Sequence, residues 1–337
     1  MITSSPQRIE ALTSAGGWGT DTLHGLLASH AINRPTHLAV KDQPNRESLT
    51  GDPPLALTWA QLELASEAVA IQLQQLGISA EDRLIIQLPN VVELLVAYYA
   101  VSKIGAILSP VPVQYGSHEL QLLAGALDPA AVITMERFRD TDLAGAARLA
   151  LPATRVLTFG SDLQLENRNP EQRHETRCDD ANRVISICWT SGTTGTPKGV
   201  PRSHNMWLAT ARSSIAAGNY SGNDVLLNPF PLVNMAALGG FLFPAALLGS
   251  SIVLHHPLDP PLFLQQMQDE KITFTIAPPA LLNQLAKSPE LWNRFDFSAL
   301  RCVGSGSAPL APWMIDTFSR EFGKEVVNFY GSNEGIS

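Results

Sequence analysis

Short apolar runs alternate with helical patterns along most of this chain, and this alternation restricts its fold more than any other feature. Residues 83–88 form an apolar run of strand length, 90–103 follow as a helix that is apolar on most faces, and 106–113 are a second strand candidate. Before them, Thr58 is placed to cap an amphipathic helix that Gly77 ends. Such strand–helix–strand units pair in parallel. The sequence therefore predicts an α/β fold of layered, mostly parallel β-sheets flanked by helices.

The alternation continues to the end of the chain and is interrupted once. Residues 161–183 carry many charged side chains, with Leu163 and Leu165 as the main apolar anchors, and are predicted to be an exposed connector. A first α/β subdomain would then cover 1–160 and a second 184–337. The other expected strands are 130–134, 155–159, 184–189, 224–228, 251–255, 273–277, 300–303 and 325–329, and the expected helices are 203–217, 235–248, 260–270 and 311–322.

Composition and charge exclude several classes of protein. The 337 residues are enough for about two compact units, and the net charge of −8 without a basic cluster disfavours a nucleic-acid partner. The cysteines are Cys178, Cys188 and Cys302, an odd number without a CxxC pair, which favours a reducing compartment. No secretory leader is visible at the start. We therefore expect a cytoplasmic protein.

One uncharged stretch, 225–254, exceeds the roughly 20 residues that a membrane helix needs. Pro229, Pro231 and Pro244 divide it into pieces too short to span a bilayer. We expect this stretch to be buried in the protein, and we expect no membrane partner.

A loop rich in glycine and hydroxyl groups follows the strand that ends at Trp189. Converging backbone N–H groups, hydroxyl donors and the positive charge of Lys198 are suited to a polyphosphate, whereas a plain turn needs none of them. A P-loop of the Walker type is disfavoured, because Pro197, Gly199 and Pro201 keep Lys198 out of a helix and on a loop. The candidate phosphate-binding residues are Thr190, Ser191, Gly192, Thr193, Thr194, Gly195, Thr196 and Lys198.

A second group of candidates follows the predicted strand at 325–329. Tyr330, Gly331, Ser332, Asn333 and Glu334 would stand at a strand's carboxyl end, which is where open α/β sheets bind ligands. One carboxylate such as Glu334 is enough for a Mg²⁺ ion that bridges nucleotide phosphates, although a helix-start glutamate is the alternative.

The turn at 304–309 begins like a dinucleotide fingerprint, but it has Pro309 where that fingerprint has glycine, so NAD is not implied.

The string Thr190–Gly199 resembles the signature of the adenylate-forming superfamily, which includes acyl- and aryl-CoA synthetases, adenylation domains of peptide synthetases and firefly luciferase. Further similar stretches occur in the same order along nearly the whole chain: 57–62, 77–90, 103–110, 277–281, 304–310 and 330–334. The resemblance implies the N-terminal large domain of such an enzyme, which forms an acyl-adenylate from ATP and a carboxylic acid and passes the acyl group to a thiol.

Roles for individual residues are implied by this resemblance. Tyr330 would stack on adenine, Asn333 would contact the α-phosphate in a position where the family commonly has Thr, and Glu334 would hold Mg²⁺. The turn formed by Gly304, Ser305, Gly306, Ser307, Ala308 and Pro309 would border adenine and the acyl group.

Asn234 stands where relatives often carry an aromatic residue or His beside the substrate carboxylate. Its small or apolar neighbours lead us to expect a hydrophobic or aromatic acid as substrate. The expected thiol is coenzyme A, and the phosphopantetheine of a carrier protein is the alternative.

Relatives in the superfamily continue beyond the position where this chain stops, at Ser337. The missing portion would hold a ribose-binding Asp, the hinge and the adenylation lysine. We expect a truncated N-terminal portion without the C-terminal domain, which binds ATP or acid weakly and adenylates slowly or not at all. Two other functions stay open: a non-catalytic nucleotide- or acyl-binding module, and a phosphotransferase or ATPase that uses the same loop.

Overall fold

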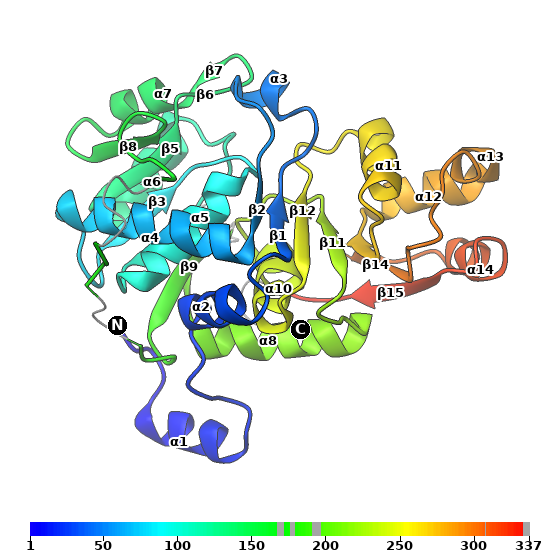
Figure 1. The fold of residues 1–337 in the computed structure, drawn as a ribbon, viewed down its shortest axis with the longest axis horizontal. Coiled ribbons are helices and arrows are strands. Elements are labelled where there is room, and N and C mark those ends of the chain that lie inside the picture. Colours follow the sequence, from blue (N-terminus) through cyan, green and yellow to red (C-terminus); the bar gives the residue numbers. More distant parts are fainter. Residues whose placement is uncertain (167–171, 176–178, 191–196, 307, 333–337) are drawn as a thin grey trace.

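The computed structural model describes residues 1–166, 172–175, 179–190, 197–306 and 308–332, and two large sheets form the frame of this portion of the chain (Figure 1). In the six-stranded sheet the order is β10 (Lys198–Ser203), β9 (Val184–Thr190), β4 (Ile107–Pro110), β3 (Arg83–Ile86), β5 (Ala131–Met135) and β8 (Arg155–Phe159). In the seven-stranded sheet it is β15 (Glu325–Phe329), β14 (Cys302–Gly306), β13 (Phe274–Ile276), β11 (Val225–Asn228), β12 (Ser251–Leu254), β1 (Leu38–Lys41) and β2 (Ala56–Thr58).

Both sheets are parallel apart from one edge strand each. β10 pairs antiparallel with β9, and β2 pairs antiparallel with β1. The predicted mostly parallel α/β architecture is confirmed. Each sheet contains strands from both sides of residues 161–183. β1 and β2 belong to the seven-stranded sheet, whose other strands follow this stretch, and β9 and β10 belong to the six-stranded sheet, whose other strands precede it. The division into two subdomains stays a prediction.

Helices cover both faces of both sheets, whereas α1 (Pro6–Ser14) has no buried residue and lies apart from them (Figure 1). The other α-helices of the described chain are α2 (Leu23–Asn33), α3 (Arg46–Thr50), α4 (Trp59–Gln75), α5 (Val92–Lys103), α6 (Ser117–Leu127), α7 (Leu143–Ala150), α8 (His204–Gly218), α9 (Met235–Ala237), α10 (Phe243–Leu248), α11 (Pro260–Asp269), α12 (Pro279–Lys287), α13 (Pro289–Trp292) and α14 (Pro312–Arg320). A small hairpin, β6 (Arg137–Phe138) and β7 (Thr141–Asp142), lies beside α3 (Figure 1).

The strand period of two residues assigns the faces of the sheets. On β3, Leu84 and Ile86 join the large core shared with α4, α5, α8 and α10, whereas Ile85 joins the outer core with α6 and α7. On β12, Ile252 turns toward the same large core and Val253 toward the outer core with α11, α12 and α14. The described chain is therefore layered as helix, sheet, helix, sheet, helix.

The helix predicted after Thr58 is confirmed, and its start has a capping box. The Thr58 hydroxyl accepts the Gln61 backbone N–H, and the Gln61 side chain accepts the N–H of Thr58. Gly77 follows the end of α4 with a φ of 85°, a left-handed conformation that glycine adopts without steric cost.

The helix predicted for 235–248 is confirmed in its bounds, but it is not α-helical throughout. The structure has α9, a π-helix at Leu238–Leu242 and then α10. Pro244 has no N–H to donate to the carbonyl of Gly240 four residues earlier, and the Tyr220 hydroxyl donates to that carbonyl instead at 3.3 Å. Two glycines of the π-helix, Gly239 and Gly240, line the cavity described below.

Residues 161–183 are anchored at several of their described positions. Leu163 is fully buried, and the His174 backbone and ring nitrogens each bond Glu67 of α4 at 2.8–2.9 Å. Other described residues of this stretch, such as Asp162 and Glu166, are exposed as expected.

The described helices include none with the length and apolar character needed to cross a membrane. The uncharged stretch 225–254 is divided among β11, three short helical segments and β12.

Candidate functional site

A cavity of about 470 Å³ lies where parallel strands of the seven-stranded sheet end. Ile276, Gly306 and Phe329 are the last residues of β13, β14 and β15, and Phe230 follows β11 by two residues. Ligands of open α/β sheets bind at this edge. The lining residues are Thr210, Ser214, Phe230, Met235, Ala236, Gly239, Gly240, Ile276, Gly306, Ala308, Pro309, Asn328, Phe329, Tyr330 and Gly331.

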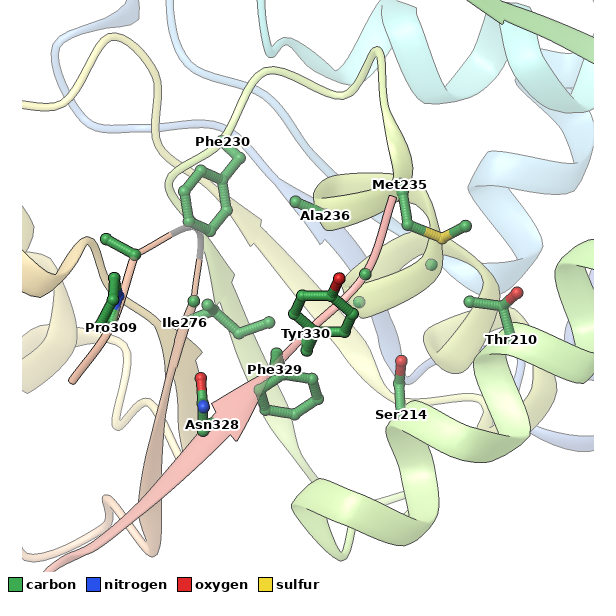
Figure 2. Close-up of a pocket in the computed structure, with 15 residues that line it drawn as sticks. Thr210, Ser214, Phe230, Met235, Ala236, Ile276, Pro309, Asn328, Phe329 and Tyr330 are labelled. Atoms are coloured by element: carbon green, nitrogen blue, oxygen red, sulfur yellow. The ribbon is translucent and has the colours of Figure 1, made fainter. Parts of the chain in front are cut away.

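The opposite wall is helical. Thr210 and Ser214 are four residues apart and project from one face of α8, with Met235 beside them (Figure 2). Phe230 and Pro309 lie at the other side, and Tyr330 stands between the two groups (Figure 2). Most of the lining side chains are apolar, with hydroxyl and amide groups at a few points, which is the usual composition of a small-molecule site.

Two glycines of β14 bring the strands together at the cavity. A Cβ at Gly304 would lie 2.7 Å from Ile276 and 2.8 Å from Phe329, both of which line the cavity. A Cβ at Gly306 would lie 2.4 Å from the carbonyl oxygen of Phe329, its paired residue on β15. Larger residues at these positions would push the strand ends apart.

Five of the sequence-predicted site residues line this cavity: Gly306, Ala308, Pro309, Tyr330 and Gly331. Tyr330 is 78% exposed, so its ring is accessible to a ligand. Ser305 is buried and its hydroxyl donates to the carbonyl of Ala277 at 2.9 Å, a bond within the sheet.

Three other predicted residues, Gly304, Asn234 and Ser332, are not among those that line the cavity. The buried Oδ1 atom of Asn234 has no hydrogen-bond partner among the described residues, and the next residue, Met235, does line the cavity.

The prediction that Lys198 lies on a loop is wrong. Lys198 begins β10 and pairs with Thr190 at the end of β9, so the two residues face each other across the base of a hairpin. Pro201 does not prevent this strand, because β10 is the edge strand of its sheet and the missing N–H breaks no ladder on the far side. Ser191, Gly192, Thr193, Thr194, Gly195, Thr196, Ser307, Asn333 and Glu334 lie outside the described residues.

Several lining residues were not predicted from the sequence. Phe230 and Ile276 lie at or just after predicted strands, so their position at a carboxyl edge was a usable signal. The only sequence signal for Thr210 and Ser214 is their spacing of four residues, which places them on one face of the helix but does not show what that face contacts.

Two buried histidines, His204 and His255, form hydrogen bonds within the fold and are not among the residues that line the cavity. His204 is buried in the first turn of α8, and its Nδ1 accepts the backbone N–H of Leu23 at 3.1 Å. His255 bonds Gln266 and the N–H of Asp259. Within the described ranges no cluster of three His, Cys, Asp or Glu residues is suited to a metal ion.

Burial of His204 predicts acid sensitivity. Burial lowers the pKa of His204 to about 3 from an ordinary value of 6.5. Between these two pH values the ring is neutral in the folded protein but protonated in the unfolded chain. The contribution of His204 to stability is therefore fully present above pH 6.5 and is lost as the pH falls from 6.5 toward 3. At pH 4.5, two units below the ordinary value, this residue should lower the free energy of unfolding by about 3 kcal/mol.

Urea denaturation of the wild type and of His204→Gln between pH 7.5 and 4.5 measures this effect. The variant keeps an acceptor and should lose less stability on acidification, whereas His118→Gln on the exposed face of α6 should behave as wild type. Equal pH slopes for His204→Gln and wild type would contradict the assignment.

An open α/β sheet with an apolar cavity at the carboxyl ends of its strands places the chain in the class that binds small ligands at this edge. The family model described as AMP-binding enzyme matches residues 37–337. The chain therefore belongs to the AMP-binding enzyme family, and its resemblance to adenylate-forming enzymes is confirmed.

Two curated relatives are named as CoA ligases of aromatic acids. An indoleacetate–CoA ligase of Aromatoleum aromaticum is 29% identical over 82% of this chain and 55% of its own length. A 4-coumarate–CoA ligase of Solanum tuberosum is 30% identical over 79% of this chain and 50% of its own. The chain thus spans about half the length of these relatives.

Solved structures share the fold. The crystal structure of VinN has a TM-score of 0.81 at 22% identity and covers 95% of this chain, with 77% of VinN covered in turn. The N-terminal domain of FACL13 from Mycobacterium tuberculosis has a TM-score of 0.76 at 23% identity, with 92% of this chain and 75% of that domain covered.

Proposed function

We propose that the protein activates a hydrophobic or aromatic carboxylic acid with ATP and transfers the acyl group to a thiol. The observation that carries this proposal is the mostly apolar cavity at the ends of β11, β13, β14 and β15, bordered by the exposed ring of Tyr330. The membership in the AMP-binding family and the ligase names of the relatives support it.

Two bond exchanges make up the reaction. A carboxylate oxygen attacks the α-phosphorus of ATP, the bond from that phosphorus to the bridging oxygen breaks, and pyrophosphate leaves. A thiolate then attacks the carbonyl carbon of the mixed anhydride, and AMP leaves. Holding acid and nucleotide in one cavity lowers the entropic component of the barrier to the first step.

We assign the acid to the region of the cavity formed by Met235, Gly239, Gly240 and Ile276, and adenine to the surface beside Ala308, Pro309 and Tyr330. The acid region is lined by glycine backbone and apolar side chains, which suits an aromatic ring. The adenine region has an exposed tyrosine ring that offers a stacking face.

ATP, Mg²⁺ and coenzyme A are the proposed cofactors, with a carrier-protein phosphopantetheine as the alternative thiol. A bound Mg²⁺ would supply charge neutralisation at the phosphates. Its proposed ligand Glu334 and the proposed phosphate-binding residues 191–196 lie outside the described residues. We also propose that the protein is cytoplasmic, that its main partner is a small-molecule acid, and that it does not bind nucleic acid.

Product analysis tests this function. The complete gene product, given ATP, Mg²⁺, coenzyme A and a panel of aryl and alkyl acids, should release AMP and pyrophosphate and show acid-dependent ATP–pyrophosphate exchange. Release of ADP and phosphate would indicate a phosphotransferase or ATPase, and thermal stabilisation by ligands without turnover would indicate a binding module.

A further inference from the structure

One buried cation lies behind the wall of the cavity. Arg202 of β10 is 6% exposed, and its guanidinium lies 4.4 Å from the ring centroid of Trp207. Trp207 is fixed in turn, because its ring stacks on Phe243 at 5.2 Å and its Nε1 donates to Ser186 at 2.7 Å. This packing holds the guanidinium in one place.

The hydrogen-bond partners of Arg202 in the described chain are neutral. Its Nη1 donates to the Met235 sulfur and its Nη2 to the Thr210 hydroxyl, both at 3.2 Å. A thioether and a hydroxyl are weak partners for a group with five N–H donors. Within the described residues no Asp or Glu forms an ion pair with Arg202, whereas the equally buried Lys103 has two such partners.

Burial lowers the pKa of the Arg202 guanidinium, as expected for a charge without an adjacent carboxylate. The group nevertheless stays protonated at neutral pH. A buried charge without a counter-ion is costly to the folded protein, and structures that keep one usually compensate it.

The position of Arg202 links this charge to the cavity. Thr210 and Met235, its two hydrogen-bond partners, both line the cavity and lie on the same side of it (Figure 2). One layer of side chains therefore separates the guanidinium from a ligand. Because Arg202 is buried, its positive charge is screened less than a surface charge and acts on an anion over several ångströms.

We propose that Arg202 is a specificity-determining residue whose buried charge, acting through the Thr210–Met235 wall, selects the ionised carboxylate of the acid over uncharged analogues. This inference rests on the proposed function, because it assumes that an acid occupies the cavity. Arg202 also positions Thr210 and Met235, but positioning alone would not make the cavity prefer a charged acid over an uncharged analogue. The nucleotide phosphate is the other anion that this charge could favour.

Binding of two nearly isosteric ligands tests the proposal. Calorimetric titration of the chain with cinnamate and with cinnamamide separates the charge from the aromatic contact. We expect the wild type to prefer cinnamate by about tenfold, and Arg202→Met to reduce this preference to about twofold or less while cinnamamide binds as before. Arg202→Lys should restore some of the preference, because it keeps the charge but loses the planar fork.

The control variant is Arg212→Met. Arg212 lies on the exposed side of α8 and donates to the carbonyl of Gly17, so this substitution changes the net charge equally but far from the wall. It should keep the full preference for cinnamate. Where Arg202→Met does not fold, Arg202→Gln removes the charge and keeps a donor toward Thr210.

The outcomes separate the two proposals. An unchanged preference for cinnamate in folded Arg202→Met or Arg202→Gln, or no preference in the wild type, would overturn the role of Arg202 and leave acid binding intact. A loss of AMP affinity relative to adenosine, with cinnamate unaffected, would overturn it in favour of the phosphate. These titrations use the complete gene product. If neither cinnamate nor any other aromatic acid binds its wild type, the proposed function fails, and the role of Arg202 fails with it.

Discussion

Replacing Arg46 by methionine is expected to lower the free energy of unfolding by about 3–5 kcal/mol, because it leaves two buried carboxylates without their cation. Arg46 on α3 is 2% exposed, and it donates to Asp42 at 2.5 Å and to Glu93 of α5 at 2.6 Å. Burial raises the pKa of Asp42 to about 6 even against the opposing charge of Arg46. Without the guanidinium, both carboxylates lose compensation that water cannot supply.

Chemical denaturation of Arg46→Met beside Arg83→Met measures this cost. Arg83 pairs with Asp128 at 3.2 Å, but both side chains are exposed, so the same substitution there should cost about 1 kcal/mol or less. A loss at Arg46 no larger than the loss at Arg83 would show that the buried triad is not a major source of stability.

Replacing Gly306 by alanine is expected to damage both stability and ligand binding. The added Cβ would lie 2.4 Å from the backbone oxygen of Phe329, which β14–β15 pairing holds in place. Backbone cannot rotate away as a side chain can, so the strand ends must separate, at a cost of about 1–3 kcal/mol. Because Gly306 and Phe329 both line the cavity, affinity for an aromatic acid should fall at least tenfold.

Gly125→Ala is the matched control for this substitution. Gly125 lies within α6 with no heavy atom within 4 Å of an added Cβ. Alanine there should raise stability by about 0.5–1 kcal/mol and leave cinnamate binding unchanged. Wild-type affinity and stability in Gly306→Ala would show that the cavity does not depend on the close approach of β14 and β15.

Much of the secondary structure could be predicted because its signals are local. The cap at Thr58, the end at Gly77 and the apolar strand at 83–88 each depend on residues within a few positions along the chain. Strand boundaries match the predictions at β8 and β15 and differ by at most three residues elsewhere, as at β14. Where a local signal was misinterpreted, the pairing with another segment determined the structure. Lys198 is in a strand because β9 is available to pair with it.

The candidate site was partly predictable for the same reason. Pro309 and Tyr330 follow predicted strands, and an open α/β sheet binds ligands at that edge, so their joint position follows from topology. The opposite wall was not predictable. Whether Thr210 or Arg212 of α8 faces a cavity depends on how the helix packs, and the spacing along the helix contains no information about that.

By itself, then, the sequence determined the α/β class, most of the elements and the group of residues from which a nucleotide and acid site could be assembled. Only the tertiary structure decided which sheet each strand joins, that a π-helix presents Gly239 and Gly240, and that Arg202 is buried behind Met235. The physical reason is range. Periods and caps arise from contacts over about four residues, whereas charge compensation and cavity shape arise from side chains tens of residues apart that meet only after the layers have packed.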